Sequence, residues 1–474
     1  MIGYPPRPMS PPRNQPLLVI VAAALLARVV GIGDESYWYD EIWSLDQVRK
    51  PFGDMLAALA REDVHPPLYS VLLWVWTRLV GESEVASRLL SALVGAAAVV
   101  PLYGLGRELW DRRTGLMAAT LLALNPYAVF YGREARSYSL MLALALWATW
   151  ALVRWASQPS RGRALVWIAA ATLLAYTHVY GSFVLVAQGL WALVFVPALR
   201  RPFLAGAATV AALLLPWVPS LLGQAGRVQQ GFWIDPITWT DPLDWMRRWY
   251  GYSIPLAVLL PLVSLRAAAE APGGAGDSAP RTSRRALLAL WIAVPLAIPV
   301  TLSLIGEPIF YHKYPIAILG ALSLLAARGL VLLPPWPRRV VAAATAALLA
   351  FHLLRDVYLT RSKEQWRELS ALATTADAVL VAEPYNRTYL GWYLRAPVVW
   401  LDGPADVDRA EQQAQARGGR VLYLQAHPPH GEHEATFAAR WRPLETTELV
   451  GARATTYLTP GAGPAGRVGG AAAH

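Results

Sequence analysis

The sequence predicts a polytopic α-helical membrane protein with a small C-terminal extracytoplasmic α/β domain. Three observations carry this prediction. The chain has 474 residues, of which 55% are hydrophobic and only 16% charged, a composition that excludes disordered, collagen-like and ordinary soluble proteins. Apolar runs long enough to cross a bilayer recur through the first three quarters of the chain. The last quarter instead alternates short β-branched runs with polar helical stretches.

About 11 apolar runs approach the length of roughly 20 residues that a membrane-spanning helix needs. The first is expected to remain in the protein, because no small-residue cleavage site precedes the acidic segment after it. The absence of cysteine excludes disulfides, thiolate catalysis and zinc–thiolate or iron–sulfur sites. The runs lie at 16–33, 88–106, 115–132, 137–155, 164–179, 181–199, 203–222, 251–266, 286–305, 314–333 and 338–354.

The distribution of charge predicts which side of the membrane each loop faces. A further apolar stretch, Pro66–Thr77, is too short to span and is expected to form an interfacial or re-entrant helix. With a cytoplasmic N-terminus, most arginines then fall in cytoplasmic loops and few in the short outer loops, as the positive-inside rule requires. The bias would invert if Pro66–Thr77 crossed the bilayer. We therefore expect a cytoplasmic N-terminus and an outer C-terminus.

The chain divides into a transmembrane domain, 1–354, and an extracytoplasmic α/β domain, 355–460. The first outer loop, 34–87, is long and acidic and is expected to carry juxtamembrane helices. Strands are predicted from 378, 397, 420 and 446 in a partly parallel sheet, and helices near 363–375, 405–417 and 433–440. The segment 267–285 is expected to be a flexible cytoplasmic linker and the Gly/Ala-rich tail 461–474 to be disordered.

Acidic and histidine side chains of the first outer loop are candidates for chemistry. Asp40 and Glu41 follow the first span in an aromatic-rich segment, where a carboxylate is positioned to act on an amphiphile. The alternative is a pair of solvated loop acids. His65 stands directly before Pro66 at the start of the interfacial helix, where capping or packing is the alternative.

Three other outer segments contain charged, histidine and tyrosine side chains that are candidates for binding or catalysis. Charges at a span end are costly to desolvate and are functional candidates, with snorkelling as the alternative. Lys313 is one of only three lysines, and an ammonium point charge suits phosphate. The positions are Arg28 near the end of the first span, Glu134, Arg136 and Tyr138 in the turn 131–138, and His312, Lys313 and Tyr314 in the segment 307–314.

All these residues lie at one predicted membrane face. Carboxylates that can take a proton and cations that can hold a phosphate are the groups needed for transfer from a lipid phosphate. The sequence has no P-loop and no Gly-rich dinucleotide motif. A nucleotide-sugar donor is therefore disfavoured, and no nucleic-acid partner is expected.

The order and spacing of these segments resemble the GT-C superfamily of membrane glycosyltransferases. The resemblance is greatest to the bacterial group of protein O-mannosyltransferases, lipid A aminoarabinose transferases and RgtA/B/C/D-like mannosyltransferases. It covers most of the chain. The segments that carry it include SYWYDEIWS at 36–44, REDVHPPLY at 61–69, GREARSY at 132–138, FYHKYP at 310–315 and KEQWREL at 363–369.

The resemblance implies an enzyme that moves a mannose-like or pentose-like sugar from a polyprenyl-phosphate carrier to a glycan, glycolipid or protein hydroxyl. The transfer would occur with inversion at the outer face of the plasma membrane. Asp40 would be the general base, with Glu41 and Glu134 as further catalytic candidates. Tyr138 and His65 would contact substrate. The donor phosphate would be held by Arg28, Arg136, His312, Lys313 and Tyr314, although many relatives have arginine where this chain has Lys313.

Several alternatives stay open. Asp40, Glu134 and His65 are a possible divalent site for Mg²⁺ or Mn²⁺, although no cofactor is required by the reaction that the resemblance implies. A transporter or flippase of a lipid-linked saccharide is the second reading, but neither repeated halves nor broken helices are visible in the sequence. A glycan polymerase and a receptor module are weaker readings. The histidines His427, His430 and His433 are expected to be solvated surface.

Overall fold

The computed structural model describes residues 15–228, 233–270, 281–382, 386–394, 397–426 and 433–461. Contacts divide the chain into two units. The first comprises Met1–Ile32 and Ser44–Thr360, and the second comprises Gly33–Trp43 and Arg361–His474. The segment Gly33–Trp43, which we expected to belong with the transmembrane helices, therefore packs with the C-terminal residues instead.

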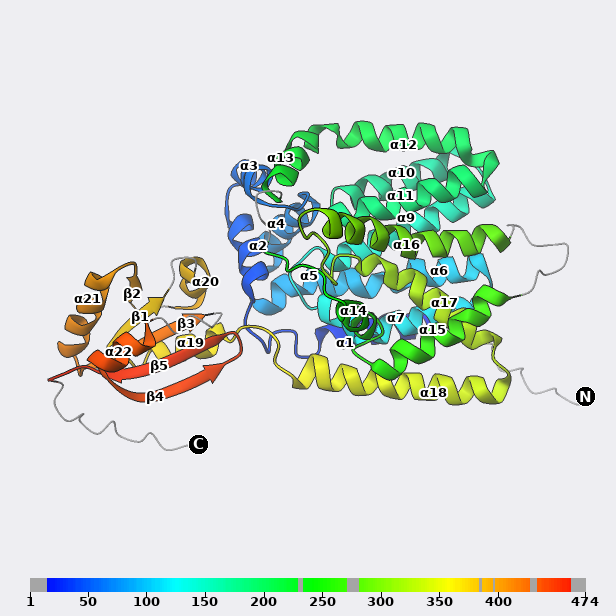
Figure 1. Cartoon of the computed structure of the whole chain (residues 1–474). Helices are drawn as coiled ribbons and strands as arrows, with labels where there is room; N and C mark the ends of the chain where they lie inside the picture. The colour runs from blue at the N-terminus through cyan, green and yellow to red at the C-terminus, as the bar shows by residue number, and fades with distance from the viewer. Residues whose placement is uncertain are drawn as a thin grey trace, which may run out of the picture. The chain divides into compact units, whose positions relative to one another are not determined.

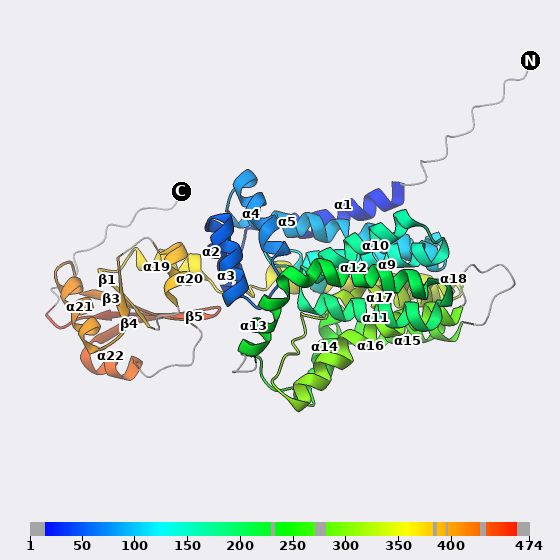
Figure 2. The ribbon, with the colours of Figure 1, turned by 90° about the horizontal axis from the view of Figure 1, so that it is seen from above.

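The first unit is built from helices, most of which lie side by side with their axes in one general direction (Figure 1, Figure 2). A further helix, α2 (Tyr39–Arg49), begins in the second unit and ends in the first. The elements of the first unit are α1 (Gln15–Val29), α3 (Phe52–Glu62), α4 (Leu68–Val80), α5 (Glu84–Ala97), α6 (Val99–Leu109), α7 (Arg112–Leu124), α8 (Pro126–Tyr131), α9 (Tyr138–Ser157), α10 (Arg161–Ala175), α11 (Val179–Phe195), η1 (Pro197–Leu199), α12 (Arg200–Leu214), η2 (Leu215–Trp217), α13 (Val218–Val228), α14 (Asp241–Trp249), α15 (Ile254–Ala269), α16 (Arg281–Ile305), η3 (Ile316–Ile318), α17 (Leu319–Leu332), α18 (Pro335–His352) and η4 (Leu353–Leu359).

Several of these helices suit a bilayer by length and composition. Among the described residues, five segments are long and apolar enough to cross one: Glu84–Leu109, Tyr138–Ser157, Pro197–Arg227, Ser283–Ile305 and Pro335–Leu359. The pair α14 and α15 makes a sixth if it is one span, bent by 79° at its break. The sequence analysis did not predict this break. It recognised the apolar run of α15 as a span, but not the polar, amphipathic helix α14 before it. The count of eleven spans and their sidedness stay predictions.

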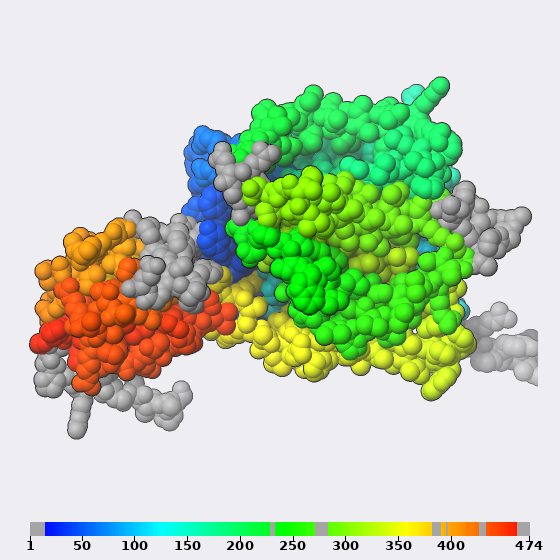
Figure 3. Space-filling view, in the orientation of Figure 1, coloured from blue at the N-terminus to red at the C-terminus, as the bar shows by residue number. Residues whose placement is uncertain are grey.

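Large apolar side chains cover the outer surface of this unit. Figure 3 shows α15, α16 and α18 at one face of it. A soluble monomer rarely exposes contiguous apolar surface on this scale. The first unit is therefore the helical part of a multi-pass membrane protein. Exposed examples are Val258, Leu262 and Leu265 on α15, Leu302, Leu304 and Ile305 on α16, and Val340 and Phe351 on α18.

The helix starts follow from short polar side chains in the sequence. Ser83, Asp111, Ser160 and Ser253 each accept a hydrogen bond from a backbone N–H in the first turn of the helix that follows. The expected interfacial helix is α4, which begins directly after the Pro66-Pro67 pair and has 13 residues. The expected linker 267–285 is shorter than predicted, because α15 continues to Ala269 and α16 begins at Arg281; residues 271–280 lie outside the described ranges.

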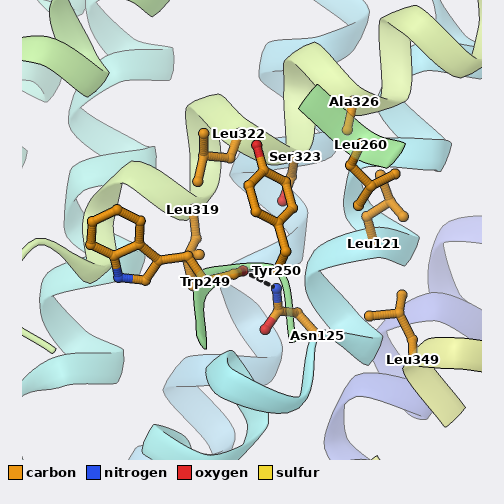
Figure 4. A pocket seen from close by; sticks show the side chains of 10 residues that line it. All are labelled: Leu121, Asn125, Trp249, Tyr250, Leu260, Leu319, Leu322, Ser323, Ala326 and Leu349. Atoms are coloured by element: carbon orange, nitrogen blue, oxygen red, sulfur yellow. Dashed lines mark hydrogen bonds between the residues drawn. The ribbon is translucent and has the colours of Figure 1, made fainter. Parts of the chain in front are cut away.

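A hydrogen-bonded contact joins the connection between α7 and α8 to the connection between α14 and α15 (Figure 4). Asn125 Nδ2 donates to the Trp249 carbonyl at 2.9 Å, while Asn125 Oδ1 accepts the Ala128 N–H and caps α8. Gly251 has a φ of 75°, and a Cβ there would lie 2.8 Å from Pro126 Cδ. The adjoining cavity has a volume of about 20 Å³. It has room for about one water molecule and is no substrate site.

The second unit contains a five-stranded sheet with the order β2-β1-β3-β5-β4. The strands β1 (Ala378–Ala382), β2 (Val398–Leu401) and β3 (Arg420–Ala426) are parallel, and β4 (Arg442–Leu449) and β5 (Ala452–Leu458) add an antiparallel hairpin. The partly parallel sheet is confirmed. The run from 446 is one hairpin and not one strand, because Gly451 turns the chain with a φ of 68°.

The helices of the second unit are α19 (Trp366–Ala373), α20 (Asn386–Tyr393), α21 (Pro404–Gln415) and α22 (Glu434–Arg440). Three of them match predicted helices, and α20 was missed. The core gathers aromatic side chains from α22 and the sheet, including Phe437, Trp441 and Tyr457. His433 is exposed at the start of α22. His427, His430 and residues 462–474 lie outside the described ranges.

Candidate active site

A cavity of about 540 Å³ opens in the first unit between α11, α13 and the end of α16. Its wall is mostly apolar, with Phe183, Leu221 and Leu302 among the lining side chains. Ile305 also lines it and is 77% exposed, so the cavity reaches the apolar outer surface. Its polar lining residues are His65, His178, Tyr180, Gln224, Glu307 and Tyr314.

Histidine 178 lies at the centre of the predicted site residues. Its ring centroid is 4.6 Å from that of His65, 5.3 Å from that of Tyr314 and 6.2 Å from that of Tyr138. The Lys313 Nζ lies 5.3 Å from the Tyr138 ring centroid. Residues from three separate sequence segments therefore meet in space. Sequence reasoning missed His178, because a single histidine near the end of an apolar run carries no pattern.

The protonation of His178 follows from its surroundings. Burial lowers the pKa of this imidazole well below its usual range, and the charges of His65, Arg136 and Lys313 lower it further. The ring is therefore neutral at pH 7. Its Nδ1 accepts the Tyr180 N–H at 3.1 Å, so the proton of the neutral ring belongs on Nε2. That Nε2 is buried without a hydrogen-bond partner, and His178 thus presents a donor at the cavity.

A mostly buried carboxylate, that of Asp63, orients His65. Asp63 Oδ1 accepts the backbone N–H groups of Val64 and His65, and it lies 3.1 Å from His65 Nδ1. Burial raises the pKa of Asp63, but the hydrogen bond from His65 and the charges of His65 and Arg136 outweigh it and hold the pKa at about 2. Asp63 is therefore an anion at neutral pH, and it fixes the rotation of the His65 ring against His178.

Two predicted phosphate-binding cations are buried at this site. Arg136 is 9% exposed and donates from Nη1 to Ser44 Oγ at 3.0 Å. Lys313 is 4% exposed, and its ammonium lies within 6 Å of the ring centroids of Tyr138, Trp233 and Tyr311. Both charges act on His178. Cations in such a low-dielectric site attract an anion more strongly than they would in water.

Two other predicted phosphate ligands have different partners. His312 Nδ1 lies 2.9 Å from the Tyr127 hydroxyl. Burial, with the charges of Arg248 and Lys313, lowers the pKa of His312 to about 3, so it brings no positive charge at neutral pH. Arg28 is 1% exposed and donates to the carbonyls of Ala24, Ala123 and Ala128, which ties α1 to α7 and α8. This geometry favours a structural role for Arg28.

Glu134 is also buried, and its charge interacts with Tyr131 and Tyr252. His65 contacts Asp63, His178 and Tyr314. Across the described residues, no group of three or more histidine, aspartate or glutamate side chains is arranged to hold a metal ion. The alternative of a divalent site formed by Asp40, Glu134 and His65 stays a prediction.

The first-loop acids Asp40 and Glu41 belong to the second unit, in the first turn of α2. Glu41 is fully buried, and its Oε2 lies 3.2 Å from Lys363 Nζ. Asp40 is half-buried. The two neighbouring carboxylates thus differ in exposure: Glu41 is fully buried in an ion pair, and Asp40 is half-buried. Nothing in the sequence indicated that Lys363, 322 residues further along, would be the partner of Glu41.

Comparison with known proteins gives one family match and several similar folds. Residues 64–220 match the family model for dolichyl-phosphate-mannose-protein mannosyltransferases. No curated protein sequence matches the chain. ArnT from Cupriavidus metallidurans in the apo state has a TM-score of 0.58 and 14% identity, covering 94% of this chain and 99% of its own. ArnT bound to undecaprenyl phosphate has a TM-score of 0.59 and 14% identity, covering 96% and 100%.

The oligosaccharyltransferase of Archaeoglobus fulgidus, in complex with zinc and sulfate, is also similar. Its TM-score is 0.53 at 11% identity, over 86% of this chain and 68% of its own. The chain has the GT-C fold. The resemblance predicted from the sequence is thereby confirmed, and glycosyltransferases that use lipid-linked sugars are the class of the matched family and these neighbours. The family match includes His65, Arg136 and His178, and it ends before Lys313.

Proposed function

We propose that this protein transfers a sugar from a polyprenyl-phosphate carrier to a hydroxyl of a cell-envelope glycan, lipid or protein. The observation that carries the proposal is the cavity of about 540 Å³, in which an apolar wall meets the polar side chains of His178 and Gln224. The buried cations Arg136 and Lys313 lie close enough for their charges to act on His178. A lipid-linked sugar has the same division into an apolar chain and a charged, polar head. The similar fold of ArnT bound to undecaprenyl phosphate supports this assignment.

The apolar wall is the place for the prenyl chain. Leu221 on α13 and Leu302 on α16 line the cavity, and the exposed Ile305 marks where it reaches the lipid-facing surface. A prenyl chain can enter there from the bilayer without crossing water. Because lipid tails are as apolar as this wall, van der Waals packing holds the chain there, and removal from water contributes nothing.

The buried cations hold the phosphate. Lys313 and Arg136 bring two positive charges, and the Nε2–H of His178 brings a neutral donor. When the bond between the anomeric carbon and the phosphate oxygen breaks, negative charge grows on that oxygen. Cations and donors fixed in advance stabilise this charge more in the transition state than in the ground state, which is what accelerates the reaction.

The amide of Gln224 is suited to the sugar. It is 3% exposed, lines the cavity, and has neither Oε1 nor Nε2 hydrogen-bonded. A buried amide without partners is unfavourable unless a ligand supplies them. A sugar hydroxyl can donate to Oε1 and accept from Nε2. The uncharged hydroxyls of a sugar therefore fit this amide.

Asp40 is the proposed general base, as the resemblance implies. Its carboxylate takes the proton of the acceptor hydroxyl, the acceptor oxygen bonds to the anomeric carbon from the opposite face, and polyprenyl phosphate leaves with its electron pair. The configuration inverts. The positive-inside charge pattern supports an outer-face location for this chemistry.

The test uses the full chain purified into nanodiscs and supplied with radiolabelled polyprenyl-phosphate sugars and a membrane-glycan acceptor. Asp40→Asn is expected to lose transfer by a factor of about 10³ or more while donor still binds. The matched control is Asp46→Asn, a half-buried acid one turn and a half further along α2. Equal transfer by Asp40→Asn and wild type would reject Asp40 as the base. Wild-type protein that transfers no sugar from any donor would contradict the proposed function.

A further inference from the structure

The C-terminal unit contains the segment Gly33–Trp43, and with it the proposed base. We propose that this unit positions Asp40, and that the buried Lys363–Glu41 ion pair is the contact that does so. The proposal rests on the proposed function for the role of Asp40, whereas the contacts themselves stand independently. It gives the α/β domain a part in catalysis, with Lys363 as a positioning residue.

The backbone of the segment is anchored at its start. The Glu35 carboxylate accepts the N–H groups of Ser362 at 2.7 Å and Lys363 at 3.1 Å. Ser36 Oγ accepts the Arg367 N–H at 3.1 Å, and the Arg367 guanidinium donates to the Asp34 carbonyl at 2.7 Å. Side-chain and backbone bonds thus join three successive residues of the segment to the chain that leads into α19.

A second anchor comes from α20. The Tyr37 N–H donates to the Tyr393 hydroxyl at 2.7 Å. The Tyr37 ring is 1% exposed and packs edge-on against Trp392, with centroids 6.0 Å apart. The segment is therefore held on two sides by the C-terminal unit before α2 begins at Tyr39.

The ion pair then fixes the first turn of α2. Lys363 Nζ lies 3.2 Å from Glu41 Oε2, and the two side chains are 5% and 0% exposed. The same oxygen accepts the Trp38 N–H at 3.3 Å. Successive residues of a helix point about 100° apart. Holding Glu41 toward Lys363 therefore sets the direction of Asp40, which stays half-buried and accessible.

A buried ion pair is a demanding contact, because loss of one partner leaves the other charge desolvated and unpaired. This explains why one of the chain's three lysines is placed here. It also predicts what a change at Lys363 does. The first turn of α2 rotates or frays to hydrate Glu41, and Asp40 moves with it. A displacement of about 1 Å at a catalytic group can reduce turnover about 100-fold.

The experiment compares Lys363→Met with wild type as full-length protein in nanodiscs, by sugar-transfer kinetics and by hydrogen exchange of residues 36–43. Lys363→Met is expected to lower kcat about 10-fold to 100-fold, with the donor KM changed less than about twofold. Exchange across 36–43 is expected to accelerate. Lys363→Arg keeps the charge and should restore most of kcat.

Two further variants complete the test. Arg440→Gln breaks an ion pair with Asp408 and Glu411 in the same unit, away from the segment, and should change neither readout. Glu41→Gln with Lys363→Met buries no charge and should fold even if the single variant does not, with kcat still reduced. Unchanged exchange in Lys363→Met, or wild-type kcat in the double variant, would overturn the positioning role. Transfer missing from wild type would reject the proposed function, while exchange would still decide the role of Lys363.

Discussion

The ammonium of Lys313 stands where the resemblance drawn from the sequence implied an arginine. Three aromatic rings surround this ammonium. An ammonium is a compact charge with three rotatable N–H donors, whereas a guanidinium presents its donors in a rigid planar fork. We expect Lys313→Gln to raise the donor KM about 10-fold or more and to lower kcat, because the growing phosphate charge loses its cation. Steady-state transfer assays with a titrated donor measure both.

Lys313→Arg distinguishes charge from shape at that position. If the site needs charge alone, activity stays within a few-fold of wild type. Lys50→Gln is the control, since Lys50 pairs at the surface with Asp46 at 3.9 Å. Wild-type kinetics for Lys313→Gln would show that Lys313 does not bind the donor phosphate.

Asp63 links the site to pH through its low pKa of about 2. A carboxyl whose folded pKa lies below its unfolded value of 3.8 stabilises the folded state above that value, and this contribution is lost as the pH falls from about 4 to about 2. Asp63→Asn should therefore lower stability by roughly 2 kcal/mol at pH 7 and remove that part of the acid sensitivity. Thermal unfolding in detergent between pH 7 and pH 3 measures the difference. Equal acid sensitivity in the variant would contradict the assignment.

At the scale of elements, α15 and α17 approach so closely that only glycine fits between them. A Cβ on Gly329 would lie 2.1 Å from the Val263 carbonyl oxygen, a backbone atom that cannot move aside alone. Gly329→Ala should therefore destabilise the helical unit by about 1–3 kcal/mol. The control is Gly162→Ala in α10, where a Cβ meets nothing within 4 Å. The melting temperature in detergent should fall only for Gly329→Ala.

Helices and strands were predicted well where they depend on residues that are neighbours in the sequence. The helix α4 follows from a short apolar run after two prolines, and the parallel strands follow from β-branched runs. The grouping of His65, Tyr138, Lys313 and Tyr314 followed from charge-based sidedness. His178, Gln224 and the Lys363–Glu41 pair were not predictable, because the role of each depends on residues that are distant in the sequence. A single chain shows residue types, but not which of them meet.

At the scale of the whole molecule, the sidedness of the loops is the expectation that the function most depends on. A polyprenyl-phosphate sugar is used at the outer face only if the site residues lie there. The predicted number of crossings is odd, so the two ends of the chain should lie on opposite sides. The charge pattern also places the loop between α9 and α10 in the cytoplasm.

The absence of cysteine makes this expectation directly testable. In spheroplasts, Arg440→Cys in the C-terminal unit should react with a membrane-impermeant maleimide, whereas Gly162→Cys should react only after permeabilisation. Both positions are exposed, so access to solvent does not limit the reaction. Labelling of Gly162→Cys in intact spheroplasts would reverse the topology and move Asp40 to the cytoplasmic side. The outer-face donor would then be excluded, even if the cavity and its cations bind a lipid phosphate.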